Sequence, residues 1–254
     1  MSSPTPAPDS SPTSLSGPSA PSSAPSSAPS APLSLTERRK AETRMAIARA
    51  AAGLFVRHGL RATRAEDIAQ SAGIAPRTFY RYFATKEEAV APLYAAGAER
   101  WAEAVRAAPP ALSVPEALEH GVRHTLTPGV GVSVNSWTWV RPLIRMAESN
   151  SGLRKVWAEV CQAGERALGE VLAERMAKGN DVTAARTPSV TSPELRFAAA
   201  AASVAVRTAV EGWAFGEEQT GAGAQAGPAE LALRNLRVLR HLPWAEIGRA
   251  PGPA

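Results

Sequence analysis

Apolar residues recur along most of the chain with the spacing of helices and rarely alternate as they do in strands. The first clear set fits the i, i+3, i+4, i+7, i+8 rule of a helix with one buried stripe: Ile47, Ala50, Ala51, Leu54 and Phe55. Alternation of Val and Ile is scarce, and long stretches rich in Ala, Leu, Glu and Arg are interrupted by Pro and Gly. The pattern therefore predicts an all-α chain.

Capping signals divide the first part of this pattern into short helices. Thr36 is expected to cap a helix that Gly59 stops, since glycine readily adopts the left-handed conformation found after helix ends. Thr63 and Glu66 have the spacing of a capping box and open a short second helix that ends near Ala72.

Two further helices follow in the same part of the chain. The third begins near Pro76, where the missing proline N–H costs nothing, and ends by Phe83. The fourth is expected to start after the N-cap Thr85 and to run to about Ala107. Pro92 falls inside it and predicts a kink, because proline cannot donate to the preceding turn.

The remaining pattern predicts five more helices, near residues 115–126, 135–149, 151–178, 193–219 and 229–241. The first 34 residues lack any such pattern. They are almost all Ser, Pro and Ala and cannot bury enough apolar area to offset their conformational entropy. We therefore expect a disordered arm, two helical domains and a flexible tail, at residues 1–35, 36–84, 85–245 and 246–254.

The second and third helices have the features of a helix-turn-helix. Gly73 can supply the positive φ of the turn, and the small Ala69 lets the two helices cross closely. The third helix offers long cations, a hydroxyl and phenols suited to a DNA major groove: Pro76, Arg77, Thr78, Tyr80, Arg81 and Tyr82. A plain helical hairpin with buried aromatics is the alternative, and we assign only Phe79 and Phe83 to the core.

Positive charge is concentrated in the same part of the chain. Residues 36–90 hold 11 Arg and Lys against 6 Asp and Glu, whereas residues 91–254 hold 17 against 16. A basic head on a nearly neutral body is typical of nucleic-acid-binding proteins, although an ordinary solvated face would show the same excess. No apolar run approaches the length of a membrane span, and no secretory signal is evident, so we expect a cytoplasmic protein without a membrane anchor.

Residues that could carry catalysis or bind a metal lack the context that either requires. His120 and His124 have i, i+4 spacing with Glu116 or Glu119 nearby, but no third ligand is evident. Cys161 has no recognisable catalytic partner and is expected to be a buried apolar residue. The sequence therefore predicts no enzyme activity, no metal site and no cofactor.

Residues 40–90 contain a dense and specific pattern. It comprises Arg44, Ile47, Ala50, Ala51, Leu54, Phe55, Gly59, Thr63, Ile68, Ala69, Ala72, Gly73, Ile74, Thr78, Phe79, Tyr80, Tyr82, Phe83 and Lys86. This pattern resembles the TetR family of bacterial transcriptional regulators. The resemblance implies a three-helix DNA-binding domain, a helical ligand-binding and dimerisation domain, and a homodimer on a near-palindromic operator.

The resemblance also implies a role for each matching residue. Thr63 and Arg64 would open the second helix at a backbone-contacting position, although many family members have Thr or Ser where this chain has Arg64. Implied base contacts belong to Pro76, Arg77 and Arg81, and implied phosphate contacts to Thr78, Tyr80, Tyr82 and Lys86.

A small-molecule effector is expected to bind between helices of the second domain, in an apolar pocket with a few polar groups. The candidate residues are Trp101, Trp137, Trp139, Arg141, Met146, Trp157, Arg207 and Trp213. Burial in the core is the alternative for each aromatic ring. Arg141, Arg145 and Arg207 would suit a carboxylate or phosphate, with surface exposure as the alternative.

The chain after residue 110 also resembles a TetR subgroup with a domain like that of the mycofactocin-system regulator. The residues that carry this resemblance are the run 142–145, Leu153, Trp157, the run 173–175, Ala209, Gly212 and Trp213. It implies an apolar or acyl-type ligand. The family also implies a homodimer through residues 193–219 and 229–241.

We therefore expect a ligand-responsive DNA-binding regulator, most often a repressor, that a small molecule releases from its operator. In the mechanism implied by the family, the ligand reshapes the second domain, the fourth helix swings, and the two DNA-reading heads lose their spacing. The alternative is a helical small-molecule-binding module or enzyme whose helix-turn-helix contacts protein instead of DNA.

Overall fold

A computed structural model of the chain describes residues 34–127, 129, 134–179, 192–216, 227–244 and 246–247. These residues form only helices: α1 (Leu35–His58), α2 (Ala65–Ser71), α3 (Pro76–Tyr82), η1 (Glu88–Val90), α4 (Ala91–Ala107), α5 (Val114–Leu126), α6 (Val134–Ser149), α7 (Ser151–Gly179), α8 (Pro193–Phe215), α9 (Pro228–Val238) and η2 (Leu239–His241). The predicted all-α fold class, with a small helical domain followed by a larger one, is confirmed. The part of the predicted arm before Ser34 lies outside the described residues.

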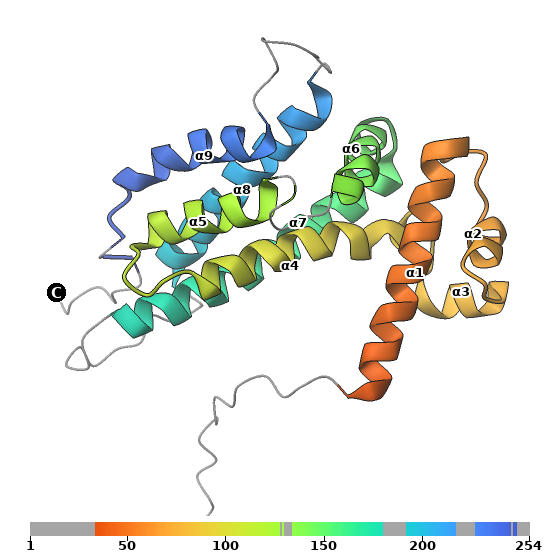
Figure 1. Cartoon of the computed structure of the whole chain (residues 1–254), viewed down its shortest axis with the longest axis horizontal. Coiled ribbons are helices and arrows are strands. Elements are labelled where there is room, and N and C mark those ends of the chain that lie inside the picture. Colours follow the sequence, from red (N-terminus) through yellow and green to blue (C-terminus); the bar gives the residue numbers. More distant parts are fainter. Residues whose placement is uncertain are drawn as a thin grey trace, which may run out of the picture.

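The helices form a small N-terminal bundle and an elongated body (Figure 1). Helices α1, α2 and α3 lie at one end, and α4 leads from them along the body. In the body, α4 packs against α5 and α7, and α8 packs against α7 and α9. Helix α1 contacts α4, α6 and η1, so the small bundle is joined to the body mainly through α1.

The N-cap of the first helix lies two residues earlier than predicted. Ser34, and not Thr36, is its N-cap: the Glu37 N–H donates to Ser34 Oγ (3.2 Å), and the Ser34 N–H donates to Glu37 Oε2 (2.8 Å). Because both bonds of a capping box form at Ser34, the helix starts at Leu35.

The predicted capping box of Thr63 and Glu66 is wrong by one position. Thr63 is buried, and its hydroxyl donates to the Gly59 carbonyl (2.9 Å) instead of accepting from the helix. The helix is capped by Asp67, whose carboxylate accepts from the Arg64 N–H (2.8 Å). Thr63 therefore stabilises the loop before α2 and does not begin the helix.

The predicted kink at Pro92 is also wrong. The segment after Thr85 first forms the 3₁₀ helix η1, and α4 begins only at Ala91. Pro92 therefore lies in the first turn of α4, where backbone N–H groups have no partner within the helix. Thr85 still contributes to this entry, since its hydroxyl accepts from the Glu88 N–H (3.2 Å).

Helix α8 ends at Phe215 and not at residue 219 as predicted. Gly216 leaves the helix in an extended conformation. Two arginines of α6, Arg141 and Arg145, donate to the last carbonyls of α8 and of this glycine. These bonds satisfy backbone groups that would otherwise extend the helix or need water.

Arginine side chains also hydrogen-bond to the C-terminal carbonyls of three other helices. Arg44, Arg175 and Arg154 donate to the C-terminal carbonyls of α3, α4 and α6, respectively. Arg175 of α7 alone donates to four carbonyls between Val105 and Leu112, and it thereby fixes the end of α4 and the following loop to α7.

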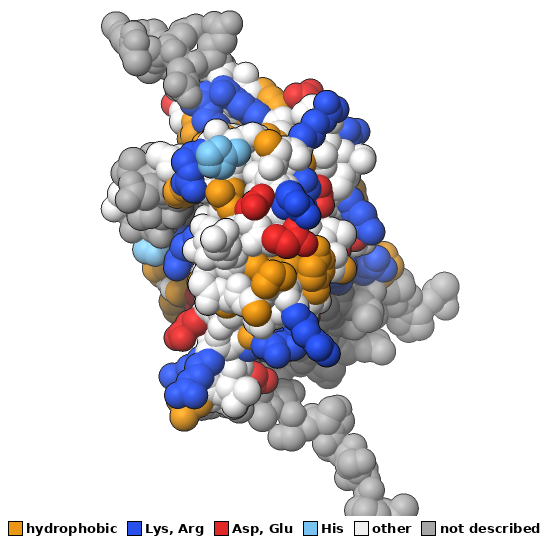
Figure 2. Space-filling view, turned by 90° about the vertical axis from the view of Figure 1, so that its right-hand side faces the viewer, with side chains coloured by type: hydrophobic (Ala, Val, Ile, Leu, Met, Phe, Trp, Pro, Cys, Tyr) orange, Lys and Arg blue, Asp and Glu red, His pale blue; other side chains and the backbone are white. Residues whose placement is uncertain are grey.

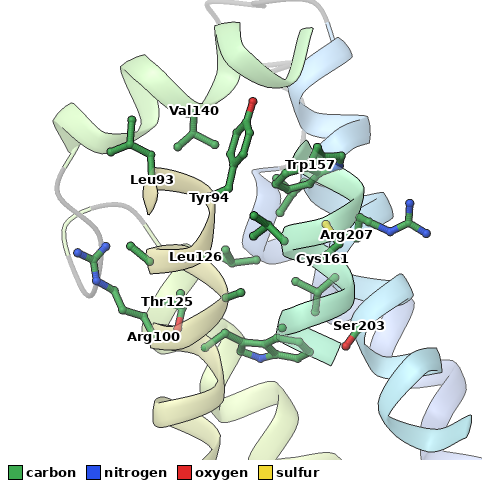
Figure 3. Close-up of a pocket in the computed structure, with 18 of the residues that line it drawn as sticks. Leu93, Tyr94, Arg100, Thr125, Leu126, Val140, Trp157, Cys161, Ser203 and Arg207 are labelled. Carbon is green, nitrogen blue, oxygen red and sulfur yellow. The ribbon is translucent and has the colours of Figure 1, made fainter. Parts of the chain in front are cut away.

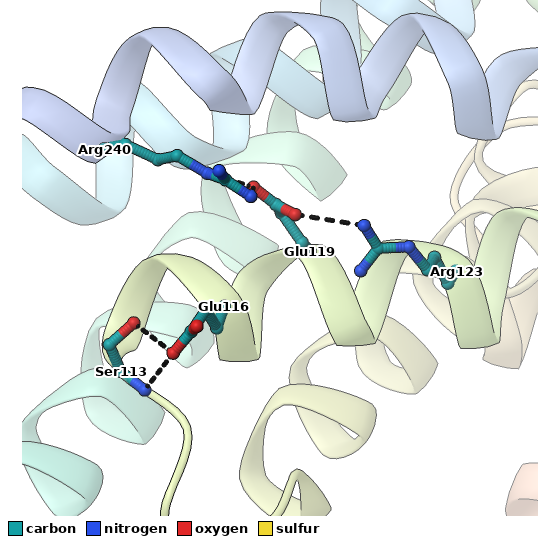
Figure 4. Close-up of polar contacts among 5 residues, drawn as sticks. All are labelled: Ser113, Glu116, Glu119, Arg123 and Arg240. Carbon is teal, nitrogen blue, oxygen red and sulfur yellow. Dashed lines mark hydrogen bonds and ion pairs between the residues drawn. The ribbon is translucent and has the colours of Figure 1, made fainter.

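An ion pair on a buried carboxylate joins η2 to α5 (Figure 4). Glu119 is 4% exposed, and its carboxylate lies 2.6 Å from Arg240 Nη2 and 3.1 Å from Arg123 Nη2. Beyond these helices, Ile247 is buried in the core although it falls in the predicted tail, so the packed body continues at least to this residue.

We expect Arg240→Ala to lower the free energy of unfolding by about 2 kcal/mol, because Glu119 would stay buried with Arg123 alone. Urea denaturation followed by circular dichroism measures the loss. The matched control is Arg234→Ala, because Arg234 and Glu230 are both exposed and lie 3.8 Å apart. Its cost should stay below about 0.5 kcal/mol, and equal losses in the two variants would contradict the special role of Glu119.

Candidate DNA interface and effector cavity

Helices α2 and α3 form the predicted helix-turn-helix. Gly73 has a φ of +69° in the turn, a conformation that residues with a Cβ rarely adopt. The turn is closed by the Ile74 N–H, which donates to the Ala69 carbonyl (2.9 Å). Ile68, Ala69 and Phe79 are fully buried between the helices, so the direction of α3 is fixed by apolar packing.

The outer face of α3 is polar, aromatic and basic. Pro76, Arg77, Tyr80 and Arg81 are exposed, whereas Thr78 and Tyr82 are half-buried. Phe83 is 3% exposed, and this burial together with that of Phe79 confirms the core assignment of both rings. Figure 2 shows this end of the molecule, where Lys and Arg side chains surround a smaller group of acidic ones.

Arg44 of α1 positions the end of α3. Its Nη1 donates to the Tyr82 carbonyl (3.1 Å), and its guanidinium lies 4.6 Å from the centre of the Phe83 ring. The sequence predicts no role for Arg44 beyond its place in the family pattern. The local sequence cannot predict this role, because it depends on a tertiary hydrogen bond between residues 38 positions apart.

Two of the predicted DNA-contacting residues are engaged inside the domain. Lys86 Nζ donates to the carbonyls of Leu60 (2.7 Å) and Thr63 (2.8 Å), and Thr63 is itself 2% exposed. Arg64 differs, since 76% of its side chain is exposed and its Nε lies 3.5 Å from the Glu66 carboxylate. Lys86 and Thr63 therefore hold the loop between α1 and α2, while Arg64 is available at the surface.

The body contains a cavity of about 540 Å³ bordered by α4, α5, α6, α7 and α8 (Figure 3). Of the predicted ligand residues, the structure brings five to its wall: Trp101, Trp137, Trp139, Trp157 and Arg207. Arg141, Met146 and Trp213 are not part of this wall. Trp213 lies behind it, packed edge-on against Trp137 at 4.9 Å and beneath Arg141 at 5.0 Å.

The wall residues that sequence reasoning missed include Tyr94, Thr125, Cys161 and Ser203, which are polar or carry sulfur. Single Ser, Thr and Tyr residues in a helical pattern give no signal of a site. Cys161 is half-buried and not fully buried as predicted, and its surroundings raise the pKa of the thiol to about 12, mainly through burial. It therefore stays a neutral thiol near pH 7.

The predicted anion-binding arginines are occupied elsewhere. Arg141 and Arg145 hold the end of α8, as described above. Arg207 lies 3.7 Å from Glu211, and its guanidinium points away from the cavity (Figure 3). Glu211 also accepts from Trp157 Nε1 (2.6 Å), which fixes this indole in the wall.

The cavity also reaches the N-terminal bundle. Met45 and Arg49 of α1 form part of its lining. Next to them, Gly53 of α1 lies so close to Trp139 that a Cβ at this position would be 3.2 Å from the indole ring. A molecule in the cavity would therefore touch the same helix that supports α3.

Within the described residues, no group of three His, Cys, Asp or Glu side chains could hold a metal ion. His120 and His124 stack with their ring centres 6.4 Å apart, and the neighbouring Glu119 is bound by two arginines. None of the helices in the described part of the chain is long and apolar enough to cross a membrane.

Three known structures have folds similar to that of this chain. One is the crystal structure of Thermus thermophilus FadR, a TetR family transcriptional repressor, in complex with lauroyl-CoA, with 23% identity over 83% of this chain and 99% of that one (TM-score 0.46). The fatty acid degradation regulator FadR from Bacillus halodurans has 21% identity over 79% and 96% (TM-score 0.45). Salmonella enterica GusR has 18% identity over 82% and 96% (TM-score 0.45).

Sequence comparison concerns the N-terminal part. A curated relative, the HTH-type transcriptional regulator TcmR of Streptomyces glaucescens, is 42% identical over 62 residues, which are 24% of this chain. The match spans only 27% of that relative's length. Residues 47–91, which include α2, α3 and η1, match the family of bacterial regulatory proteins named tetR. The N-terminal helices of the chain are therefore similar to the tetR family of regulatory proteins.

Proposed function

We propose that this protein is a transcriptional regulator that binds a near-palindromic DNA operator as a homodimer and releases it when a small molecule enters the cavity. The observation that carries the proposal is the division of α3 into two faces. Phe79 is fully buried against α2, while Arg77 and Arg81, one helical turn apart, are exposed together on the outside. A short helix held in this way and presenting cations is suited to a major groove.

The exposed residues suggest a division of roles at the DNA. Arg77, Arg81 and Pro76 lie where α3 would face base edges, and arginine reads guanine through two parallel hydrogen bonds. Tyr80, Tyr82, Thr78 and Arg64 would contact phosphates at the sides of the groove. Thr63 and Lys86 would act indirectly, because their polar groups hold the loop that places α2.

One face of α8 supports the proposed dimer. Phe197, Val204 and Phe215 are 63%, 41% and 45% exposed, and their spacing places them along one side of the helix. Helix α9 packs against α8, where Asn235 donates to the Ala205 carbonyl, and it also carries an exposed apolar side chain, Val238, which is 73% exposed. Large exposed apolar side chains in a row are typical of an interface between protomers.

The contacts of α4 and α1 supply a route from effector to DNA. Leu93, Tyr94 and Trp101 of α4 line the cavity, and α4 is preceded by η1, which packs on α1. A ligand that moves α4 or α1 would change the separation of the two α3 helices in a dimer. That separation must stay near 34–36 Å, about one helical turn of DNA, for both heads to bind.

The proposal is tested by measuring binding of the purified protein to DNA from upstream of its own gene and to random DNA over a range of salt concentrations. Specific binding of two protomers, with affinity that falls steeply as salt rises, would support it, because phosphate contacts release counterions. Binding to no DNA sequence would overturn it and favour a helical binding module or enzyme whose helix-turn-helix contacts protein.

We expect Arg81→Ala to cost roughly 1–3 kcal/mol in operator affinity and to relax sequence preference, because it removes a base contact. Tyr82→Phe should weaken binding to operator and random DNA about equally, since a phosphate contact carries no sequence information. Fluorescence anisotropy with labelled duplexes measures both. If Arg81→Ala reduced affinity for random DNA as much as for the operator, the base-contact assignment would be wrong.

The double variant Phe197→Glu/Val204→Glu should be monomeric, because it places charges in the proposed interface. Light scattering coupled to size exclusion gives the mass, and operator affinity should fall by about tenfold or more as the second half-site contact is lost. Leu35→Glu is the matched control, since Leu35 is 74% exposed on α1, outside this face. A double variant that stays dimeric would exclude this surface as the interface.

A further inference from the structure

The cavity gathers an unusual set of buried polar atoms. In the part of the chain that the structure describes, five buried side-chain atoms have no hydrogen-bond partner: Tyr94 Oη, Trp101 Nε1, Thr125 Oγ1, Trp137 Nε1 and Ser203 Oγ. All five residues line this cavity. A buried polar group without a partner is costly and rare in native proteins. Five around one space indicate that a bound molecule, or water in its place, supplies the missing partners.

These five groups share one chemical property, because each can donate a hydrogen bond. The indole N–H groups of Trp101 and Trp137 can only donate. The phenol of Tyr94 keeps its proton, since burial raises its pKa far above the usual value. The hydroxyls of Thr125 and Ser203 can donate as well. The wall therefore calls for a ligand that carries several hydrogen-bond acceptors.

The inner wall offers no charge to such a ligand. The charged residues on the border are Arg49, Arg100, Glu165 and Arg207; the first two are exposed and the last two half-exposed. Figure 3 shows the guanidiniums of Arg100 and Arg207 directed away from the cavity. A carboxylate or phosphate placed inside would lose its hydration without gaining a cation, so the ligand is neutral.

The positions of the donors set the length of the ligand. Tyr94 and Trp101 are seven residues apart on α4, which corresponds to about 10 Å along a helix. Tyr94 reaches toward α6, while Thr125 and Ser203 lie at the other end of the cavity (Figure 3). Much of the wall is aromatic, and at the end near α6 Tyr94 and Trp157 pack edge to face at 4.9 Å. Such a wall suits flat rings.

We propose that the cavity binds a neutral, planar polycyclic molecule about 10 Å long that carries oxygen acceptors, as in aryl ketones, quinones or aryl ethers, toward both ends. This inference rests on the proposed function only in taking the cavity as the effector site. It replaces the acyl-type ligand expected from sequence, because a fatty acyl chain would leave the donors at one end of the cavity without partners.

The test uses two probes that share a ring frame but differ in oxygen content. The probe 2,6-dimethoxyanthraquinone has acceptors along its whole length and no donor, whereas 2,6-dimethylanthracene has neither. Lauroyl-CoA and dodecanoate represent acyl ligands. Quenching of tryptophan fluorescence in the full-length protein gives the dissociation constants. We expect the quinone to bind at least about tenfold more tightly than the hydrocarbon and than either acyl probe.

Variants that remove single donors identify the groups involved. Tyr94→Phe, Thr125→Val and Ser203→Ala should each weaken binding of the quinone by about five- to tenfold and leave binding of the hydrocarbon unchanged. The melting temperature of the unliganded variants should not fall, because each substitution removes an unpaired buried group and keeps the shape of the wall. Ser149→Ala is the matched control, since this hydroxyl is exposed and donates to the Met146 carbonyl.

Equal affinities for the quinone and the hydrocarbon, tighter binding of an acyl probe, or no binding of the quinone would each overturn the inference. Unchanged quinone affinity in all three donor variants would do so as well. Salt-dependent operator binding, measured without any probe on the same preparation, reports on the proposed function separately. A protein that binds its operator but not the quinone would therefore keep the proposed function and lose only this ligand class.

Discussion

Every helix ends in backbone carbonyls that have no partner within it, and this constraint shapes the whole protein. In this chain the ends of four helices are satisfied by arginines: α3 by Arg44, α4 by Arg175, α6 by Arg154, and α8 by Arg141 and Arg145. A guanidinium is well suited to this task, because it has five donors and favours the negative end of the helix dipole. Most of these contacts join segments distant in sequence. The exception is α6, because Arg154 lies only a few residues after that helix ends.

These caps determine which parts of the molecule are held together. Arg44 attaches the end of α3 to α1, so that α3 keeps its direction even though it has only seven residues. Arg175 fixes the far end of α4 to α7, whereas the near end of α4 meets the bundle through η1. Under the proposed function, a displacement of α4 at the cavity would be resisted at the far end and would pass to the near end, next to the N-terminal bundle.

Local signals in the sequence predicted the helices well but their tertiary partners poorly. The helical stripe with Ile47 and Phe55, and the turn at Gly73, are local features, and the structure contains both. The observed helix ends differ from the predicted ones where another group forms the deciding hydrogen bond. Thr63 bonds to the Gly59 carbonyl instead of capping α2, and arginines of α6 bond to the carbonyls at the end of α8. In the cavity, Trp101 and Trp157 could be predicted because large aromatic residues are common in ligand pockets. The unpaired hydroxyls could not be predicted, because only the packing of five helices brings them to one cavity.

If a ligand of the proposed class binds, the unpaired donors would supply most of the energy that a two-state switch needs. Moving a two-state equilibrium from 1:99 to 99:1 requires a difference of about 5.5 kcal/mol in ligand affinity between the states. A hydrogen bond to a buried donor contributes about 1 kcal/mol, so five bonds made in only one state approach this value. The donors come from α4, α5, α6 and α8, so a ligand that bonds to several of them would bridge these helices. Such a ligand would favour one position of α4, which is joined to the N-terminal bundle through η1 and α1.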